Sequence, residues 1–378
     1  MRGPRADLPR WADIGLIPLA NVLLAFIVAG LIVLAIGENP LEAVQIMLTG
    51  ALGSGEGLGY TLYYATNFVF TGLAVALAFH AGLFNIGGEG QAYIGGLGVG
   101  LVLLGFDHSL SWPLLLPLAV LASLLFGAAW ALIPAYLQAY RGSHIVITTI
   151  MFNFLASSLM VYLLVNTLNE HGATNPQSRE IATTAALPFI HQILAGVGIE
   201  MAHTPLNLSI FLAALACLFV WIYVWHTPWG YELRTVGHSE RAAVYAGVKP
   251  RRVILVTLCL SGALAGLVGV NEIMGVQHRL LLNFNAGYGF TGIAVALMGR
   301  SHPLGVVLAS ILFGILTQGG AELAFEIPTI DRNMVTVIQG LVILFSGALA
   351  HFSRPWLEAL FTLLSRRRLD PAGVGGQA

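Results

Sequence analysis

Residues 15–36, GLIPLANVLLAFIVAGLIVLAI, form an apolar run without a charged side chain. A helix needs roughly 20 apolar residues to cross a bilayer core about 30 Å thick. This run is long enough, so we take it as a first membrane helix rather than a cleavable signal. Seven more runs of comparable length, with soft edges, lie at 60–81, 112–138, 145–168, 207–226, 253–275, 303–320 and 333–352. The sequence therefore predicts an all-α, polytopic membrane protein.

Two shorter runs, 88–106 and 288–299, are interrupted by glycine. If both cross the membrane, the chain has ten spans, and if both are re-entrant it has eight. The predicted number of transmembrane helices is therefore 8 to 10.

Composition agrees with a membrane protein. The chain has 378 residues, of which 57% are hydrophobic and only 9% charged, and its mean hydropathy is +0.81. Soluble domains usually carry about 25% charged residues, so this chain has too few charges to cover itself in water. Cys217 and Cys259 both lie in apolar runs, where they are expected to pack as small hydrophobic residues.

The distribution of positive charge predicts the orientation, because cytoplasmic loops carry an excess of Lys and Arg. With ten spans and the N-terminus in the cytoplasm, the outer side keeps only Arg179, Arg279 and Arg332. The cytoplasmic side then collects Arg2, Arg5, Arg10, Arg141, Arg234, Arg241, Lys249, Arg251, Arg252, Arg300, Arg354, Arg366, Arg367 and Arg368. Both termini are therefore predicted to be cytoplasmic.

The chain contains no evident linker or soluble domain. We expect a cytoplasmic tail at 1–14, one transmembrane domain at 15–352, and a second cytoplasmic tail at 353–378. Within that domain, 169–206 is expected to be an outer loop and 227–252 a cytoplasmic one.

Several kinds of chemistry are missing. Lys249 is the only lysine and is followed by Pro250, so a phosphate-binding GxxxxGK[ST] loop is excluded. No HExxH motif or zinc-spaced cysteine–histidine cluster occurs. We therefore expect no catalytic residue, no metal site and no cofactor held by this chain.

The segment 82–91, GLFNIGGEGQ, interrupts an apolar region. A charged side chain at membrane depth is costly unless it is paired or faces water. Asn85, Glu89 and Gln91 are therefore candidates for a solute pathway or gate. In the alternative interpretation, they satisfy backbone groups freed at a helix break.

Three more polar residues lie in apolar runs: Asn153, Asn271 and Glu272. A carboxamide offers two donors and an acceptor, which suits sugar hydroxyls or base edges. Hydrogen bonding between helices is the alternative, and for Asn153 it is the preferred one.

The loop at 227–252 favours a short helix from Glu240 to Ala246, with Gly237 before it as a helix breaker and Gly247 after it. Such a helix could dock on another protein, or the loop could be merely solvated. A nonamer at 70–78, FTGLAVALA, also recurs at 290–298 as FTGIAVALM. Both copies are expected to run in the same direction, which does not fit an inverted repeat. Chance similarity between helices rich in small residues explains the recurrence at least as well.

Several segments resemble importer permeases of the ATP-binding-cassette (ABC) class, in the branched-chain amino acid, simple-sugar and nucleoside superfamily. Residues 227–248 resemble their coupling region, and 261–269 (SGALAGLVG) the helix that follows it. Residues 287–299 (GYGFTGIAVALMG) resemble their late, glycine-marked segment. The stretches 82–91 and 141–154 (RGSHIVITTIMFNF) are most similar to the nucleoside and simple-sugar branch.

The resemblance implies a multi-pass permease subunit in the plasma membrane of a bacterium. It implies import of nucleosides or simple sugars, powered by separate ATP-binding subunits, with a second permease subunit and an extracytoplasmic solute-binding protein. Nucleic acid is not expected as a partner. The implied contacts with the ATP-binding subunits are Glu240, Arg241, Ala242 and Ala243, flanked by Gly237 and Gly247.

Two alternatives remain open. An ion-gradient-driven transporter or channel would use carboxylates inside the membrane, for which only Glu89 and Glu272 are available. The same permease class could instead carry a branched-chain amino acid.

Overall fold

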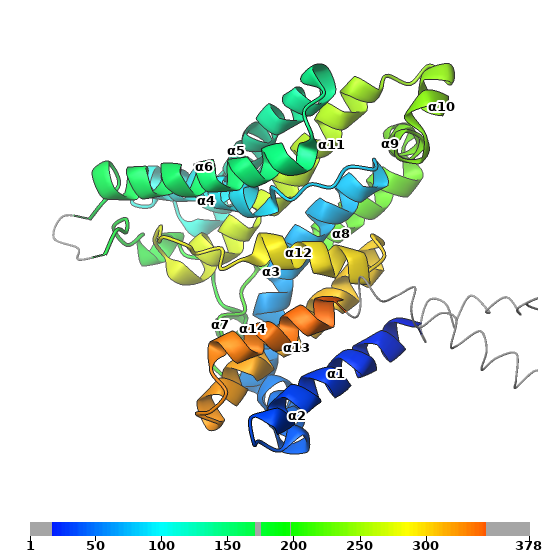
Figure 1. The fold of residues 1–378 in the computed structure, drawn as a ribbon. Coiled ribbons are helices and arrows are strands. Elements are labelled where there is room, and N and C mark those ends of the chain that lie inside the picture. Colours follow the sequence, from blue (N-terminus) through cyan, green and yellow to red (C-terminus); the bar gives the residue numbers. More distant parts are fainter. Residues whose placement is uncertain (1–16, 171–174, 197, 345–378) are drawn as a thin grey trace, which may run out of the picture. The chain divides into compact units, whose positions relative to one another are not determined.

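The computed structural model describes residues 17–170, 175–196 and 198–344. Over these residues the backbone forms helices and no strand, apart from two isolated bridges (Figure 1). The prediction of an all-α polytopic fold is confirmed. The two expected tails, at 1–14 and 353–378, lie outside the described residues, as does the end of the run at 333–352.

The chain divides into two compact units, residues 1–46 with 323–378 and residues 47–322. In the first unit, α1 (Ile17–Ala35) packs against α14 (Arg332–Ile343). The chain bends by 119° between α1 and α2 (Pro40–Leu52). The bend follows Gly37, whose φ of +98° suits glycine, and Pro40 then begins α2 with a φ already suited to a helix.

Seven helices in the described residues are long and apolar enough to cross a membrane. They are α3 (Gly55–His80), α4 (Gly88–Phe106), α5 (Trp112–Arg141), α6 (Ile145–Asn166), α8 (Ser209–His226), α11 (Pro250–Gly266) with the π-helix η3 (Val270–Gln277), and α13 (Pro303–Glu326). The bent α1–α2 pair makes an eighth if it counts as one span.

The two short runs have different outcomes. The run at 88–106 is α4, a full-length apolar helix. The run at 288–299 gives α12 (Tyr288–Met298), an 11-residue helix that is too short to cross the bilayer core.

The larger unit is built around α3 and the α11–η3 span. Their apolar windows are 83% and 78% buried, against 22% for α6. Close approach of α11 to α5 depends on paired glycines, because a Cβ on Gly262 would lie only 2.4 Å from the carbonyl oxygen of Gly127. Small residues of this kind let membrane helices pack backbone to backbone.

The two copies of the repeated nonamer lie side by side in α3 and α12. A Cβ on Gly292 would lie 2.5 Å from Cβ of Thr71. A few residues after the end of each copy, His80 Nε2 lies 3.0 Å from the carbonyl oxygen of Ser301. The copies therefore run in the same direction, as expected, and pack against each other through their small residues.

Residues 175–196 and 198–207 pack on one end of this unit. They include the short helices η2 (Thr183–Ala185) and α7 (Ile190–Ala195). The backbone of this segment bonds to the chain around η3, with Ser178 N donating to the Leu280 oxygen and Leu187 N to the Met274 oxygen. Arg179 reaches α4, where its guanidinium pairs with both oxygens of Asp107 at 2.7 and 2.9 Å.

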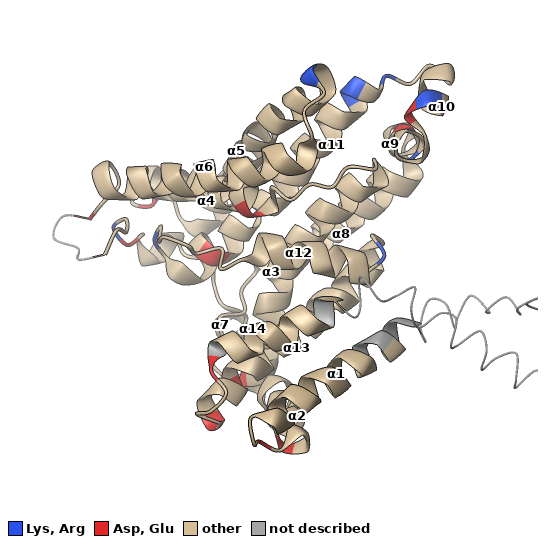
Figure 2. Cartoon of the chain, viewed as in Figure 1, with Lys and Arg blue, Asp and Glu red and all other residues tan. Residues whose placement is uncertain are grey.

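The opposite end of the unit, which we call the basic end, gathers positive charge. Figure 2 shows Lys and Arg at the end of α5, at the start of α11 and on α10 (Glu240–Tyr245). α9 (Pro228–His238) reaches the last residues of α3 here, because a Cβ on Gly237 would lie 2.1 Å from the His80 oxygen. Expected cytoplasmic cations of this unit therefore gather at α10, the end of α5 and the start of α11, and α11 contacts both of the other helices.

Candidate functional site

The break between α3 and α4 brings Asn85 and Gln91 together. Asn85 Nδ2 donates to Gln91 Oε1 at 3.0 Å and to Ser261 Oγ of α11 at 2.9 Å. Asn85 Oδ1 accepts from the backbone N–H of Gly87 at 2.9 Å. Both carboxamides are buried. They connect the helix break to α11 and give a hydrogen-bond partner to the Gly87 N–H, which the break leaves without one in a helix.

Asn153 of α6 bridges the same break from the other side. Its Oδ1 accepts from Gly90 N at 2.8 Å, and its Nδ2 donates to the Ile86 oxygen at 2.9 Å. The Gly90 N–H is one of the groups that have no partner within the first turn of a helix, and the Ile86 oxygen belongs to the break before α4. Hydrogen bonding between helices, the preferred interpretation of Asn153, describes its contacts.

Glu89 joins the first turn of α4 to the first turn of α12. Its Oε2 accepts from Gly289 N at 2.7 Å, and its Oε1 accepts from Gly287 N at 3.0 Å and Asn285 Nδ2 at 2.8 Å. A carboxylate at this position is favoured by the positive end of the helix dipole. Gly289 must be glycine, because a Cβ there would lie 2.2 Å from Glu89 N. Glu89 is thus the side chain that positions α12 on α4.

The chain that leads into α12 is strained. Asn283 and Ala286 have φ values of +57° and +43°, in the left-handed region that favours glycine. This conformation is held from α4, where the Tyr93 hydroxyl accepts from Asn283 N at 2.8 Å. The first turn of α12 and the segment before it depend on α4 for their position.

Asn271 and Glu272 form a second polar group, in η3. Only 1% of Glu272 is exposed. Its Oε1 accepts from the Tyr63 hydroxyl at 2.5 Å and from Asn67 Nδ2 at 2.6 Å. Asn271 Nδ2 donates to Asn67 Oδ1 at 2.9 Å, and Asn271 Oδ1 accepts from Asn207 Nδ2 at 2.9 Å.

The six pathway candidates therefore fall into two groups. Asn85, Glu89, Gln91 and Asn153 surround the start of α4, whereas Asn271 and Glu272 lie between η3 and α3. Every one of these side chains bonds to another part of the chain. π-Helices occur often at functional sites, and the position of the second group in η3 agrees with that tendency.

Sequence reasoning missed the partners of the second group. They are Tyr63, Asn67, Asn207, Ser209 and Gln277. A signal for two of them was present, because Tyr63 and Asn67 are four residues apart in an apolar helix and therefore share one face.

The loop expected at 227–252 forms the two helices α9 and α10 and leads into α11. Thr227 caps α9 by accepting from Gly230 N at 3.1 Å, and Ser239 caps α10 by accepting from Ala242 N at 3.3 Å. α10 ends at Tyr245, and Gly247 follows with a φ of +81°. The prediction of a short helix that begins at Glu240 and is followed by Gly247 is confirmed.

The other expectations for this loop need two corrections. Gly237 does not break the helix, because α9 continues through it to His238 and uses the missing side chain to approach α3. Ala243 is 0% exposed, so it packs within the chain and cannot itself contact another protein. Glu240, Arg241 and Ala242 are exposed, and so is Tyr245, at 94%.

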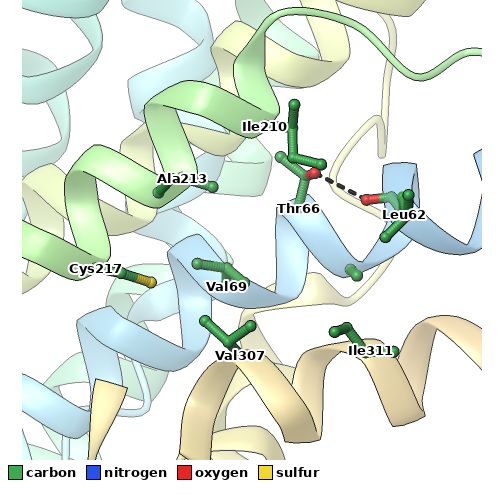
Figure 3. Close-up of a pocket in the computed structure, with 10 residues that line it drawn as sticks. Leu62, Thr66, Val69, Ile210, Ala213, Cys217, Val307 and Ile311 are labelled. Atoms are coloured by element: carbon green, nitrogen blue, oxygen red, sulfur yellow. Dashed lines mark hydrogen bonds between the residues drawn. The ribbon is translucent and has the colours of Figure 1, made fainter. Parts of the chain in front are cut away.

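A cavity of about 310 Å³ lies between α3, α8 and α13 (Figure 3). Its lining is apolar, with Val69, Cys217 and Ile311 among the side chains. The one hydroxyl in the lining, of Thr66, donates to the Leu62 oxygen at 2.8 Å. The cavity is therefore poorly suited to a solute that carries many hydroxyl groups.

Comparison with known proteins gives a family. Residues 57–347 match the family described as branched-chain amino acid transport system / permease component. The chain is 36% identical to a glucose ABC transporter permease protein of Haloferax volcanii, over 93% of this chain and 91% of that protein. It is 34% identical to a guanosine ABC transporter permease protein of Bacillus subtilis, over 87% and 92% of the two chains.

A third relative is a nucleoside ABC transporter permease protein of Lactococcus lactis, 31% identical over 87% of this chain and 90% of that protein. No solved structure matches the chain. The matched residues include both polar groups, the segment from α9 to α10 and all seven spans except the first residues of α3. The chain is therefore a member of the branched-chain amino acid transport system / permease component family.

Proposed function

We propose that this chain is a permease subunit of an ATP-driven importer and carries nucleosides or simple sugars across the plasma membrane. One observation supports it most strongly, the similarity over nearly the full length of permeases named for glucose, guanosine and nucleosides. These solutes share hydroxyl-bearing sugar rings, so a pathway for any of them needs hydrogen-bonding groups. In this chain the polar side chains of the helix break at 82–91 and of the η3 group bond within the chain, so in this proposal they hold the spans that border the passage.

In this proposal the ATP is hydrolysed by separate subunits. The chain has a single lysine, which is followed by proline, and so cannot build a phosphate-binding loop. In this proposal it acts as a transport subunit without an ATPase site, and it holds no cofactor. The exposed residues of α10, Glu240, Arg241, Ala242 and Tyr245, form the surface on which the ATP-binding subunits dock.

The contacts of α9 indicate how docking of the ATP-binding subunits would affect the membrane spans. Gly237 of α9 touches the end of α3 at His80, and Gly82 follows directly with its Cβ position 3.3 Å from the Gly237 oxygen. Movement of the α9–α10 segment would therefore displace the break between α3 and α4, in which Asn85 lies. That break contacts α11 through Ser261 and, beyond Gly88, α12 through Glu89.

The importer also needs partners on the outside and in the membrane. We propose a second permease subunit, because Bacillus subtilis has two guanosine permease proteins that match this chain, at 34% and 26% identity. A solute-binding protein would dock on the end that holds residues 175–196 and 198–207. Since the polar side chains of the candidate site are bonded within this chain, the passage would lie between the two permeases.

The test is uptake by the whole complex. The chain is co-expressed with its ATP-binding, permease and solute-binding partners, reconstituted into vesicles, and supplied with labelled nucleosides, glucose, pentoses and leucine, with and without ATP. ATP-dependent uptake of a nucleoside or sugar supports the proposal, with unlabelled competitors ranking the solutes. Uptake of leucine alone would show that the substrate is a branched-chain amino acid. Uptake that follows an ion gradient without ATP would show that the chain is not part of an ATP-driven importer.

A further inference from the structure

Four cations meet at the basic end of the larger unit, where α5 ends and α11 begins. Arg141 is the last residue of α5, and Lys249, Arg251 and Arg252 surround the start of α11. We call these four residues the inner basic cluster. The two helices are antiparallel and pack closely, because Gly127 faces Gly262 and Ser123 faces Gly266. The packing of the spans therefore brings the cations together.

A direct contact joins the two halves of this cluster. The guanidinium of Arg251 lies 5.4 Å from the centre of the Tyr140 ring, a distance at which the ring attracts the cation. Tyr140 is 48% exposed and stacks on Tyr136 one turn earlier, with ring centres 5.0 Å apart. Exposed tyrosines of this kind gather where membrane helices meet the headgroup layer.

No ion pair in the described part of the chain neutralises the inner basic cluster. All four cations are exposed, and among the residues that the structure describes none of them forms an ion pair. The first turn of α11 has no acidic residue, and the positive end of its helix dipole adds to the same field. Figure 2 shows no acidic segment at the end of α5 or the start of α11.

These features fit one ligand. A concentration of Lys and Arg directly beside membrane spans attracts anionic lipids of the cytoplasmic leaflet, and the tyrosines place this cluster at the level of the headgroups. We propose that the inner basic cluster binds the phosphate of an anionic phospholipid, whose acyl chains lie along α5 and α11. The position beside α9 and α10, which both contact α11, places this lipid next to the proposed docking surface. The inference does not depend on the transported solute.

The experiment measures bound lipid rather than transport. The complete complex is purified in detergent, incubated with equal amounts of phosphatidylglycerol and phosphatidylcholine of the same acyl chains, and examined by native mass spectrometry. The wild type is expected to retain several times more phosphatidylglycerol than phosphatidylcholine. The double variant Arg251→Gln/Arg252→Gln is expected to lose that preference, whereas Arg251→Lys/Arg252→Lys keeps it.

The matched control is Arg300→Gln, which removes a cation between α12 and α13 rather than one from the cluster and should leave the preference unchanged. Millimolar inorganic phosphate should not displace the lipid, and displacement would make the site one for free phosphate. If the glutamine double variant does not fold, Arg141→Gln/Lys249→Gln replaces it. Equal retention of the two lipids by the wild type, or an unchanged preference in the folded glutamine variants, would overturn the proposal.

Discussion

Glu89 links two helices directly, because its carboxylate lies in the first turn of a membrane span and accepts from the backbone N–H groups of Gly287 and Gly289 at the start of α12. We predict that Glu89→Gln lowers uptake about tenfold. A carboxamide presents one acceptor and one NH₂ group, so a buried N–H loses its partner at a cost of about 1–3 kcal/mol, and 1.4 kcal/mol is a factor of ten. The measurement is ATP-dependent uptake in reconstituted vesicles.

The control for this variant is Glu56→Gln, at an exposed acidic residue at the start of α3. It should leave uptake unchanged. Glu89→Asp, which keeps the charge but shortens the side chain, should retain part of the uptake. Normal uptake by Glu89→Gln would show that the position of α12 does not depend on this carboxylate.

The ion pair between Asp107 and Arg179 should make the stability of the protein depend on pH. The hydrogen-bonded guanidinium of Arg179 lowers the pKa of Asp107 to about 2. Because the folded pKa is below the unfolded value of about 3.9, the pair stabilises the protein fully above that value, and its contribution is lost as the pH falls through about 2. We expect Asp107→Asn to lower the melting temperature by about 1–2 °C at neutral pH, since a partly exposed pair contributes about 1 kcal/mol.

The measurement is thermal unfolding in detergent across a pH series. The difference between wild type and Asp107→Asn should shrink below pH 4 and vanish near pH 2. A difference that stays constant over this range would mean that Arg179 stabilises the segment through its bond to the Leu104 oxygen rather than through charge.

At the scale of the helices, close packing depends on where the glycines lie. A Cβ on Gly262 would press on the backbone of α5, whereas a Cβ on Gly105 of α4 would meet nothing within 4 Å. We predict that Gly262→Ala destabilises the protein by about 1–3 kcal/mol through overpacking. Gly105→Ala should be neutral or raise stability by about 0.4–1 kcal/mol.

These two variants make the same chemical change in two helices of the same unit. Thermal unfolding in one detergent compares them directly. Equal melting temperatures for both variants would show that α11 can move away from α5 at little cost.

Variants in the α9–α10 segment are predicted to insert into the membrane normally but to lose transport. Glu240 is exposed at the start of α10, so Glu240→Lys should not disturb the fold, but it reverses a charge on the proposed docking surface. We expect normal amounts of protein in the membrane and loss of ATP-dependent uptake. Tyr245→Ala should weaken recruitment of the ATP-binding subunits, because it removes the largest exposed side chain of this helix.

Both variants are compared with Glu56→Lys, which reverses a charge at the opposite end of α3. Membrane content by immunoblot, co-purification of the ATP-binding subunits and uptake are measured on the same preparations. Normal uptake by Glu240→Lys would remove this segment from the mechanism.

The sequence predicted the spans well because membrane helices are marked by the length and composition of one local segment. The candidate site was less predictable, because its contacts are distant in the chain: 176 residues separate Asn85 from Ser261, and 200 separate Glu89 from Gly289. The failure at Gly237 has a local origin, since a glycine that ends a helix and one that allows close packing look the same in sequence. Burial of Ala243 was equally hidden, because a six-residue helix shows little periodicity.

At the scale of the whole molecule, the prediction with the largest consequence concerns the orientation of the chain in the membrane. The basic end holds the ends of α3, α5 and α12 and the start of α11, and the positive-inside rule places such an end in the cytoplasm. Docking of ATP-binding subunits on α10 requires the same orientation, since ATP is on that side. Two independent arguments thus predict that α10 is cytoplasmic and that residues around Glu200 face outward.

Cysteine labelling tests this prediction. Cys217 and Cys259 are replaced by alanine, and a single cysteine is introduced by Glu200→Cys or by His238→Cys, both at exposed positions. A membrane-impermeant maleimide should label the Glu200→Cys variant in intact cells and the His238→Cys variant only in inverted vesicles. The opposite pattern would place α10 outside the cell, where no ATP-binding subunit could reach it, and would remove both the docking surface and the cytoplasmic lipid site. Labelling of both variants in intact cells would mean that the chain between them does not cross the membrane, which contradicts α8 as a span.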